Sequence, residues 1–161
     1  MKIILITVSI LFSTLIYSEY LQNVYVTNVT DGDTFHATHR GKKYKIRLSE
    51  IDAPEKQQEM GQTAAAFLAT LLEGNYVDLE TIGSDRYGRL LARVFLDGKD
   101  INMILVNNGM AWAYEKYLQD KSFLEAQKQA KENSLGLWSL DKPTPPWVWR
   151  NKPIIKSCCR V

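Results

Sequence analysis

The segment NVYVTNVTDGDTFHATHRGKKYKIRLSEIDAPE, residues 23–55, carries the strongest structural signal in the chain. Residues 23–30 alternate and are rich in β-branched and aromatic side chains, a pattern that predicts a β-strand. An Asp-Gly pair follows and supplies a turn, because both residues tolerate the backbone angles of tight turns. Residues 34–38 and 43–48 predict two further strands, so the segment begins as a run of short strands.

The third of these strands indicates which of its faces is buried. Its side chains alternate between an apolar face with Tyr44, Ile46 and Leu48 and a basic face with Lys43, Lys45 and Arg47. The sequence Ile-Asp-Ala-Pro at 51–54 then ends the regular structure, because a residue before proline is pushed away from helical angles.

Downstream of this segment the pattern changes to helix and then returns to strand. Residues 62–72, QTAAAFLATLL, are rich in alanine and leucine and stop near Gly74, which predicts a helix. Residues 76–82 and 90–96 predict a fourth and a fifth strand. Five short strands with a helix between the third and fourth predict a mainly β, α+β domain: a five-stranded OB-type Greek-key barrel with about three helices.

The second half of the chain completes this domain. Helices are predicted at 101–108 and at 120–133, the latter with Asp120 as its N-cap. From residue 141 the sequence is rich in proline and tryptophan, so we expect an extended tail at 141–161 and place the folded domain at 19–140.

The first 18 residues differ from the rest. Lys2 is followed by an uncharged apolar run at 3–16 and a small residue, Ser18, which is typical of a secretory signal peptide. The run is shorter than the roughly 20 residues of a membrane-spanning helix. We therefore expect an exported protein, secreted or periplasmic, without stable membrane association after cleavage. A retained membrane anchor is the rival interpretation.

Bulk charge does not indicate a nucleic-acid binder, because 20 basic residues face 18 acidic ones. Two local groups of basic residues exist: Arg40, Lys42, Lys43, Lys45 and Arg47, and then Arg86, Arg89 and Arg93. From charge alone, a solvated strand face explains each group better than a phosphate site does. The two cysteines, Cys158 and Cys159, are adjacent and provide neither a zinc site nor an internal disulfide framework. They are free thiols or form an intermolecular bridge.

Three polar clusters could carry chemistry. The first, DGDT at 31–34, is not an EF-hand, because a lysine or a tyrosine occupies the position of the bidentate glutamate, depending on where the count starts. The second, at 47–55, sets an arginine and hard carboxylate ligands suited to Ca²⁺ around a proline turn. The third, DRYGR at 85–89, places arginines on a glycine turn, where they could reach a phosphate. Taken singly, each is also compatible with a charged turn or a surface salt bridge.

Together these clusters resemble the staphylococcal nuclease (thermonuclease) family, in particular its bacterial secreted members. The matching motifs, in order, are VTDGDTF, KIRLSEIDAPE, SDRYGRLLARVFLDGKDIN, NNGMAWAY, GLW and PPWVWR. The resemblance covers about residues 23–150. It implies a calcium-dependent nuclease that hydrolyses phosphodiester bonds in DNA and RNA and leaves 3′-phosphates, acting as a monomer.

The resemblance also implies a site. Asp33 and Asp52 would supply carboxylates to Ca²⁺ and Ala53 its backbone carbonyl, with Asp31 further out, through water. Arg47, Glu55 and Arg89 match the catalytic positions of the family. Two guanidinium groups and a divalent cation would stabilise the charge that develops on the phosphoryl oxygens. Glu55 would act as general base or would orient the attacking water.

Substrate binding is expected beside these groups. Tyr87 matches a tyrosine that lines the nucleotide pocket, Arg86 lies next to it, and Tyr114 or Tyr117 would supply a second tyrosine. Stacking and phosphate contacts would bind nucleic acid with little base specificity. Two alternatives stay open: a non-catalytic OB-type module that binds nucleic acid or protein, and an envelope calcium-binding protein without a nucleic-acid role. The first alternative would be expected to lack part of the catalytic set.

Overall fold

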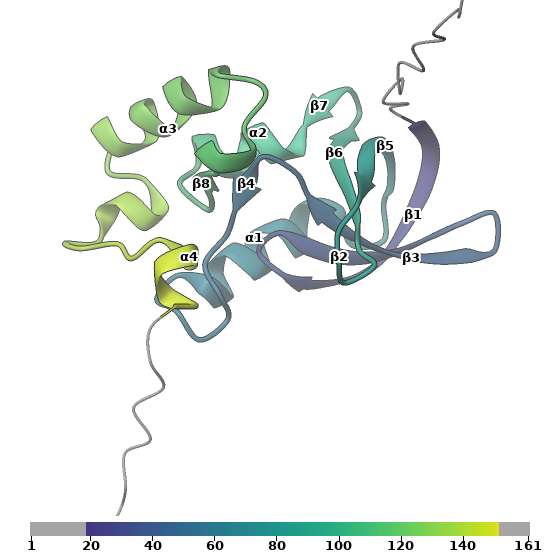
Figure 1. Cartoon of the computed structure of the whole chain (residues 1–161), viewed down its shortest axis with the longest axis horizontal. Coiled ribbons are helices and arrows are strands. Elements are labelled where there is room, and N and C mark those ends of the chain that lie inside the picture. The colour runs from purple at the N-terminus through teal and green to yellow at the C-terminus, as the bar shows by residue number, and fades with distance from the viewer. Residues whose placement is uncertain (1–18, 152–161) are drawn as a thin grey trace, which may run out of the picture.

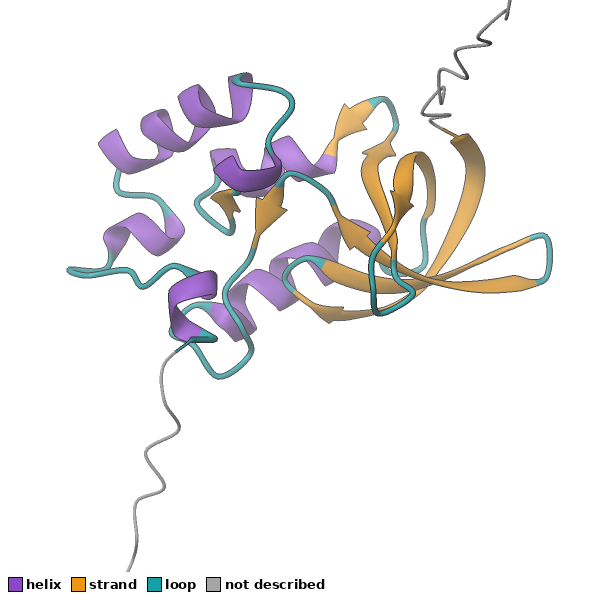
Figure 2. Ribbon diagram, viewed as in Figure 1, coloured by secondary structure: helices purple, strands orange, loops and turns teal. Residues whose placement is uncertain are grey.

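The computed structural model describes residues 19–151, in which the long strands gather in one half of the molecule and most of the helices in the other (Figure 2). The predicted signal peptide, residues 1–18, and the Cys158-Cys159 pair lie outside the described residues. Within 19–151, no helix combines the length and the apolar character needed to cross a bilayer.

Five main strands form a closed barrel. They are β1 (Glu19–Asp31), β2 (Thr34–His39), β3 (Lys42–Leu48), β5 (Tyr76–Ser84) and β6 (Leu90–Leu96). Neighbours pair antiparallel in the order β3-β2-β1-β5-β6, and a parallel pairing between β3 and β6 closes the ring. The predicted OB-type barrel is confirmed.

Three shorter strands complete the β-structure: β4 (Ile51–Asp52), β7 (Lys99–Asp100) and β8 (Trp112–Ala113). β7 extends the main sheet beside β6, while β4 and β8 form a separate two-stranded sheet. In that small sheet Asp52 lies opposite Trp112, so the segment after β3 is held against the helical half of the molecule.

The alternation in β3 predicts its burial correctly. Ile46 and Leu48 are inaccessible in the barrel core and Tyr44 is half-buried, whereas Lys43 and Lys45 are exposed. Because successive side chains of a strand point to opposite faces, this register directs Arg47 out of the core.

The helices are α1 (Gly61–Leu72), α2 (Ile101–Asn107), α3 (Ser122–Glu132) and α4 (Pro146–Trp149), with 3₁₀ turns at Glu115–Tyr117 and Gly136–Ser139. α1 contacts β1 and buries Ala64, Leu68 and Leu72, which lie one turn apart on one face (Figure 1). α2 packs on β6 and against α3, so the helical half is anchored to the barrel.

Two local expectations are wrong. The tail is not wholly extended, because α4 forms within it; Pro146 stands at the first helical position, where a missing N–H costs no hydrogen bond. α3 begins at Ser122 rather than at Asp120. The Asp120 carboxylate still accepts a hydrogen bond from the Ser122 N–H at 2.9 Å, so it acts just outside the helix.

Candidate active site

Two turns that are distant in the sequence meet beside the barrel. The Leu48 N–H donates to the Asp33 carbonyl at 2.9 Å, which joins the end of β3 to the turn between β1 and β2. A Cβ at Gly32 would lie 2.7 Å from the Cβ of Ala53, so only glycine permits this close approach. The first two clusters predicted from the sequence therefore form one structural unit.

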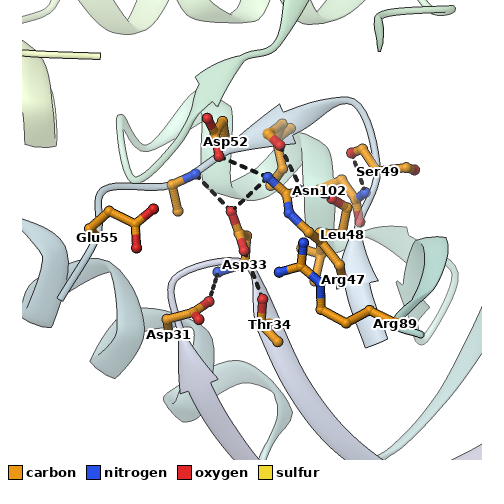
Figure 3. A network of polar contacts seen from close by, with 12 residues as sticks. Asp31, Asp33, Thr34, Arg47, Leu48, Ser49, Asp52, Glu55, Arg89 and Asn102 are labelled. Atoms are coloured by element: carbon orange, nitrogen blue, oxygen red, sulfur yellow. Dashed lines mark hydrogen bonds and ion pairs between the residues drawn. The ribbon is translucent and has the colours of Figure 1, made fainter. Parts of the chain in front are cut away.

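Asp33 is the buried centre of this unit (Figure 3). Its Oδ2 accepts from the Ala53 N–H at 3.0 Å and lies 3.1 Å from Nη2 of Arg47. Its Oδ1 accepts from the Thr34 hydroxyl at 2.9 Å, and its own N–H donates to Asp31 at 3.1 Å. These contacts fix the carboxylate direction.

Asp52 faces Asp33 across the same arginine nitrogen. Its residue surface is 0% exposed, and Oδ1 lies 2.8 Å from Nη2 of Arg47. Burial raises the pKa of Asp52, the negative charge of Asp33 adds to this rise, and the hydrogen bonds from Arg150 oppose it. Burial and the charge of Asp33 likewise raise the pKa of Asp31, to about 6. The three aspartates thus form a region of concentrated, poorly solvated negative charge.

Arg47 is held rigidly between backbone and carboxylates. Its Nη1 donates to the carbonyls of Leu48 and Ile51, the latter at 3.0 Å. Burial alone would lower the pKa of Arg47, but the charges of Asp33 and Asp52 outweigh it and raise the pKa. The guanidinium is therefore a fixed positive charge at the site.

Arg89 approaches from the turn between β5 and β6. Asp85 organises that turn: one carboxylate oxygen accepts from the N–H groups of Tyr87 and Arg89 at 2.9 and 3.0 Å. The other oxygen accepts from Nε of Arg89 at 2.7 Å. Because Nε makes this contact, the two Nη groups stay available for another ligand, and Figure 3 shows the side chain beside Arg47.

Aromatic and basic side chains lie next to these groups. Tyr87 is 69% exposed, and its hydroxyl accepts from Arg86 at 2.7 Å. Tyr114 and Tyr117 form an edge-to-face pair with centroids 5.0 Å apart. Tyr114 also stacks on Trp147, with centroids 5.2 Å apart and planes 6° from parallel.

Together with Asp31, the ten residues predicted to contact metal or substrate directly line one cleft of about 1220 Å³. They are Asp33, Arg47, Asp52, Ala53, Glu55, Arg86, Tyr87, Arg89, Tyr114 and Tyr117. The sequence could not establish this convergence, because the groups come from four separate segments of the chain.

Among the cleft residues that were given no role from the sequence, two make notable contacts at the site. Arg150 donates to Asp52 and to Glu55, at 2.6 and 2.8 Å, and Trp147 forms the stack described above. The motif PPWVWR was part of the resemblance, but an arginine after an aromatic pair carries no functional signal without its spatial partners.

The donor set suits a hard divalent cation. Oxygens of Asp33 and Asp52 lie 3.1 and 2.8 Å from the same fixed nitrogen of Arg47, so the two carboxylates are close together and supply hard oxygen ligands to one region of the cleft. Ala53 lies directly after Asp52 and lines the same cleft. Between residues 19 and 151, no group of three or more His, Cys, Asp and Glu side chains is arranged to hold a metal. Two carboxylates and a carbonyl would therefore need water to complete the coordination.

Comparison with known proteins agrees with this geometry. The model of the family described as "Staphylococcal nuclease homologue" matches residues 45–140, more than half of the chain. An "uncharacterized endonuclease" of Haemophilus influenzae is 39% identical over 153 residues, which covers 94% of this chain and 86% of that protein. An Escherichia coli protein of the same description is 40% identical over 128 residues, covering 79% of this chain and 84% of the relative. A "micrococcal nuclease" of Shigella flexneri is 37% identical over 136 residues, with 78% of each chain covered.

A closed OB-type barrel with this family match defines a nuclease, a hydrolase whose substrates are nucleic acids. The chain belongs to the staphylococcal nuclease family. Members of this family depend in general on a metal ion.

Proposed function

We propose that this nuclease is calcium-dependent, hydrolyses phosphodiester bonds in both DNA and RNA, and leaves 3′-phosphate ends. The observation that supports it is the convergence of Asp33, Asp52 and Glu55 with Arg47 and Arg89 in one cleft. The alternative of a binding module is disfavoured, because it does not explain why a complete set of acids and arginines is gathered there.

The chain would supply most of the electrostatic stabilisation. Attack on a phosphodiester places negative charge on the phosphoryl oxygens, and fixed positive groups lower the energy of that state. Arg89 has two Nη groups not used by Asp85, so it can present a planar fork to a phosphate. Arg47 contributes a second, immobile charge. Arginine is a poor proton donor, so both act mainly through charge.

Glu55 would act on the attacking water. Its side chain is 37% exposed and lines the cleft, so solvent can reach the carboxylate. It would take a proton from the water or orient it, and both roles need a negatively charged Glu55.

Asp33, Asp52 and the carbonyl of Ala53 would hold Ca²⁺, with Asp31 acting through a bound water. When bound, the ion would add positive charge next to the phosphoryl group. Burial raises the pKa of Asp31 and Asp52, and repulsion from Asp33 adds to the rise, so a cation would relieve an unfavourable concentration of charge.

Broad substrate use would follow from the aromatic groups. Tyr87 and Tyr117 are exposed, so their rings could stack on any base, and Arg86, beside Tyr87, would add a phosphate contact. We further propose that the protein is exported through residues 1–18, has no stable membrane association afterwards, and acts as a monomer.

The test uses protein purified from expression of the full chain, incubated with single-stranded DNA, duplex DNA and RNA. We expect cleavage with Ca²⁺, loss of cleavage with chelator, and products that block primer extension until a phosphatase removes the 3′-phosphate. Glu55→Gln, with an unchanged circular dichroism spectrum, is the matched inactive variant. Undiminished cleavage in chelator would refute the metal assignment, and binding without cleavage would favour the non-catalytic module.

A further inference from the structure

The C-terminal strap, residues 144–151, returns to the site that the barrel forms. The amide of Gln58 links the two: it donates to the Thr144 carbonyl at 3.0 Å and accepts from the Glu55 N–H at 2.8 Å. The Trp147 ring stacks on Tyr114. In Figure 1, α4 of the strap lies beside the segment that joins β4 to α1. The strap is therefore placed by contacts to both sides of the cleft.

Arg150, near the end of this strap, is bonded to the two acids on either side of the Ala53-Pro54 pair. Its Nη2 donates to Oδ2 of Asp52 at 2.6 Å, and its Nη1 donates to Oδ1 of Asp52 at 3.2 Å and to Glu55 at 2.8 Å. Oδ1 of Asp52 also lies 2.8 Å from Arg47. Both carboxylate oxygens of Asp52 are thus occupied by guanidinium groups.

We propose that Arg150 is a displaceable counter-charge of the metal site: it neutralises Asp52 and Glu55 without metal and must release Asp52 when a divalent cation binds. This inference rests on the proposed function, because it takes Asp33 and Asp52 as the metal carboxylates. It follows that Arg150 lowers the affinity of the site for metal.

The surroundings of the two arginines explain why Arg150 is the one that leaves. The Arg47 side chain is 12% exposed and donates to two backbone carbonyls, so it cannot move away from the aspartates without losing these hydrogen bonds. The Arg150 side chain is 42% exposed, and all three of its hydrogen bonds at the site are to the two acids. Solvent can take over the hydrogen bonds of a half-exposed guanidinium, whereas a buried one would lose them.

A cation on Oδ2 of Asp52 would compete with Arg150 for that oxygen. A Ca²⁺–oxygen contact of about 2.4 Å, beside a guanidinium nitrogen that lies 2.6 Å from the same oxygen, would place two positive charges next to each other, and the two charges repel. Arg150 lines the same cleft as Arg47, Arg86 and Arg89, so after release it would add a fourth arginine on the substrate side.

The experiment measures Ca²⁺ binding by isothermal titration calorimetry, with protein from the full chain and without nucleic acid. Arg150→Gln should bind Ca²⁺ roughly three- to tenfold more tightly than the wild type, the size expected for removing one partly exposed competing ion pair. Arg150→Lys, which keeps the charge but not the fork, should fall in between. Lys142→Gln removes an exposed charge from the region just before the strap and should change the affinity less than twofold.

The outcomes separate this inference from the proposed function. Equal or weaker binding by Arg150→Gln, with wild-type binding intact, would overturn the role of Arg150 and leave the calcium site standing. No binding by either protein would overturn both. Binding by Arg150→Gln alone would support the inference. If circular dichroism shows that Arg150→Gln does not fold, the titration of Arg150→Lys tests the proposal instead. A Ca²⁺ affinity of Arg150→Lys equal to that of the wild type would overturn it.

Discussion

Asn102→Ala should destabilise the domain more than the removal of any other side-chain amide in α2. Asn102 is 0% exposed and lies at the start of that helix. Its Oδ1 accepts from the Val94 N–H at 3.1 Å, and its Nδ2 donates to the Ser49 carbonyl at 3.0 Å. The side chain therefore ties α2, β6 and the segment after β3 together (Figure 3).

The magnitude follows from the groups left without a partner. Nδ2 also donates to the Ala92 carbonyl at 3.3 Å, but that carbonyl keeps the Ser49 N–H at 2.8 Å. Removal thus leaves one buried N–H and one buried carbonyl, at about 1–3 kcal/mol each. The two groups together cost about 2–6 kcal/mol and a small cavity adds to this, against a typical total stability of about 5–15 kcal/mol.

Urea unfolding in chelator, followed by tryptophan fluorescence, measures this loss. The matched control is Asn108→Ala, because Asn108 is exposed, lies just after α2, and its side chain donates to the Ile104 carbonyl of that helix at 2.8 Å. That variant should lose less than about 1 kcal/mol. If Asn102→Ala loses no more than Asn108→Ala, the inferred role of the buried amide is refuted.

Three further perturbations test the site and its support. Arg89→Ala should lower kcat on DNA by about 10²–10³ while the circular dichroism spectrum is unchanged, because a fixed charge on the phosphoryl group is lost; near-normal turnover would remove Arg89 from the catalytic set. Gly61→Ala places a Cβ 1.9 Å from the Glu55 carbonyl, so thermal unfolding should show a loss of about 1–3 kcal/mol or more, and an unaltered melting temperature would contradict the close approach. Asp31 has a pKa raised to about 6 from 3.8, so its contribution to stability is complete below about pH 4 and is lost as the pH rises through about 6. The free energy of unfolding of Asp31→Asn, measured with urea in the absence of metal, should therefore compare more favourably with that of the wild type at pH 7 than at pH 4. An equal difference between the two proteins at both pH values would count against this linkage.

Features that arise within short stretches of chain were readable from the amino acids alone. Alternation in residues 43–48 indicated which side of β3 is buried, and Ile46 and Leu48 are inaccessible as expected. Composition placed α1 to within a residue of its observed start at Gly61. Ordered motifs identified the family. Each signal depends on side chains that are near neighbours, so the backbone geometry of one element is enough to interpret it.

Contacts between segments that are distant in the sequence could not be predicted from such local signals. The parallel pairing of β3 with β6, the burial of Asn102 and the meeting of Arg150 with Asp52, 98 residues earlier, all depend on how complete elements pack. The start of α3 and the helical turn of α4 were missed for a related reason, since helix ends depend on a few competing hydrogen bonds. Local propensity constrains one element at a time. The packing of the barrel against its helices is what brings Arg150, which no sequence pattern distinguishes, to Asp52 and Glu55.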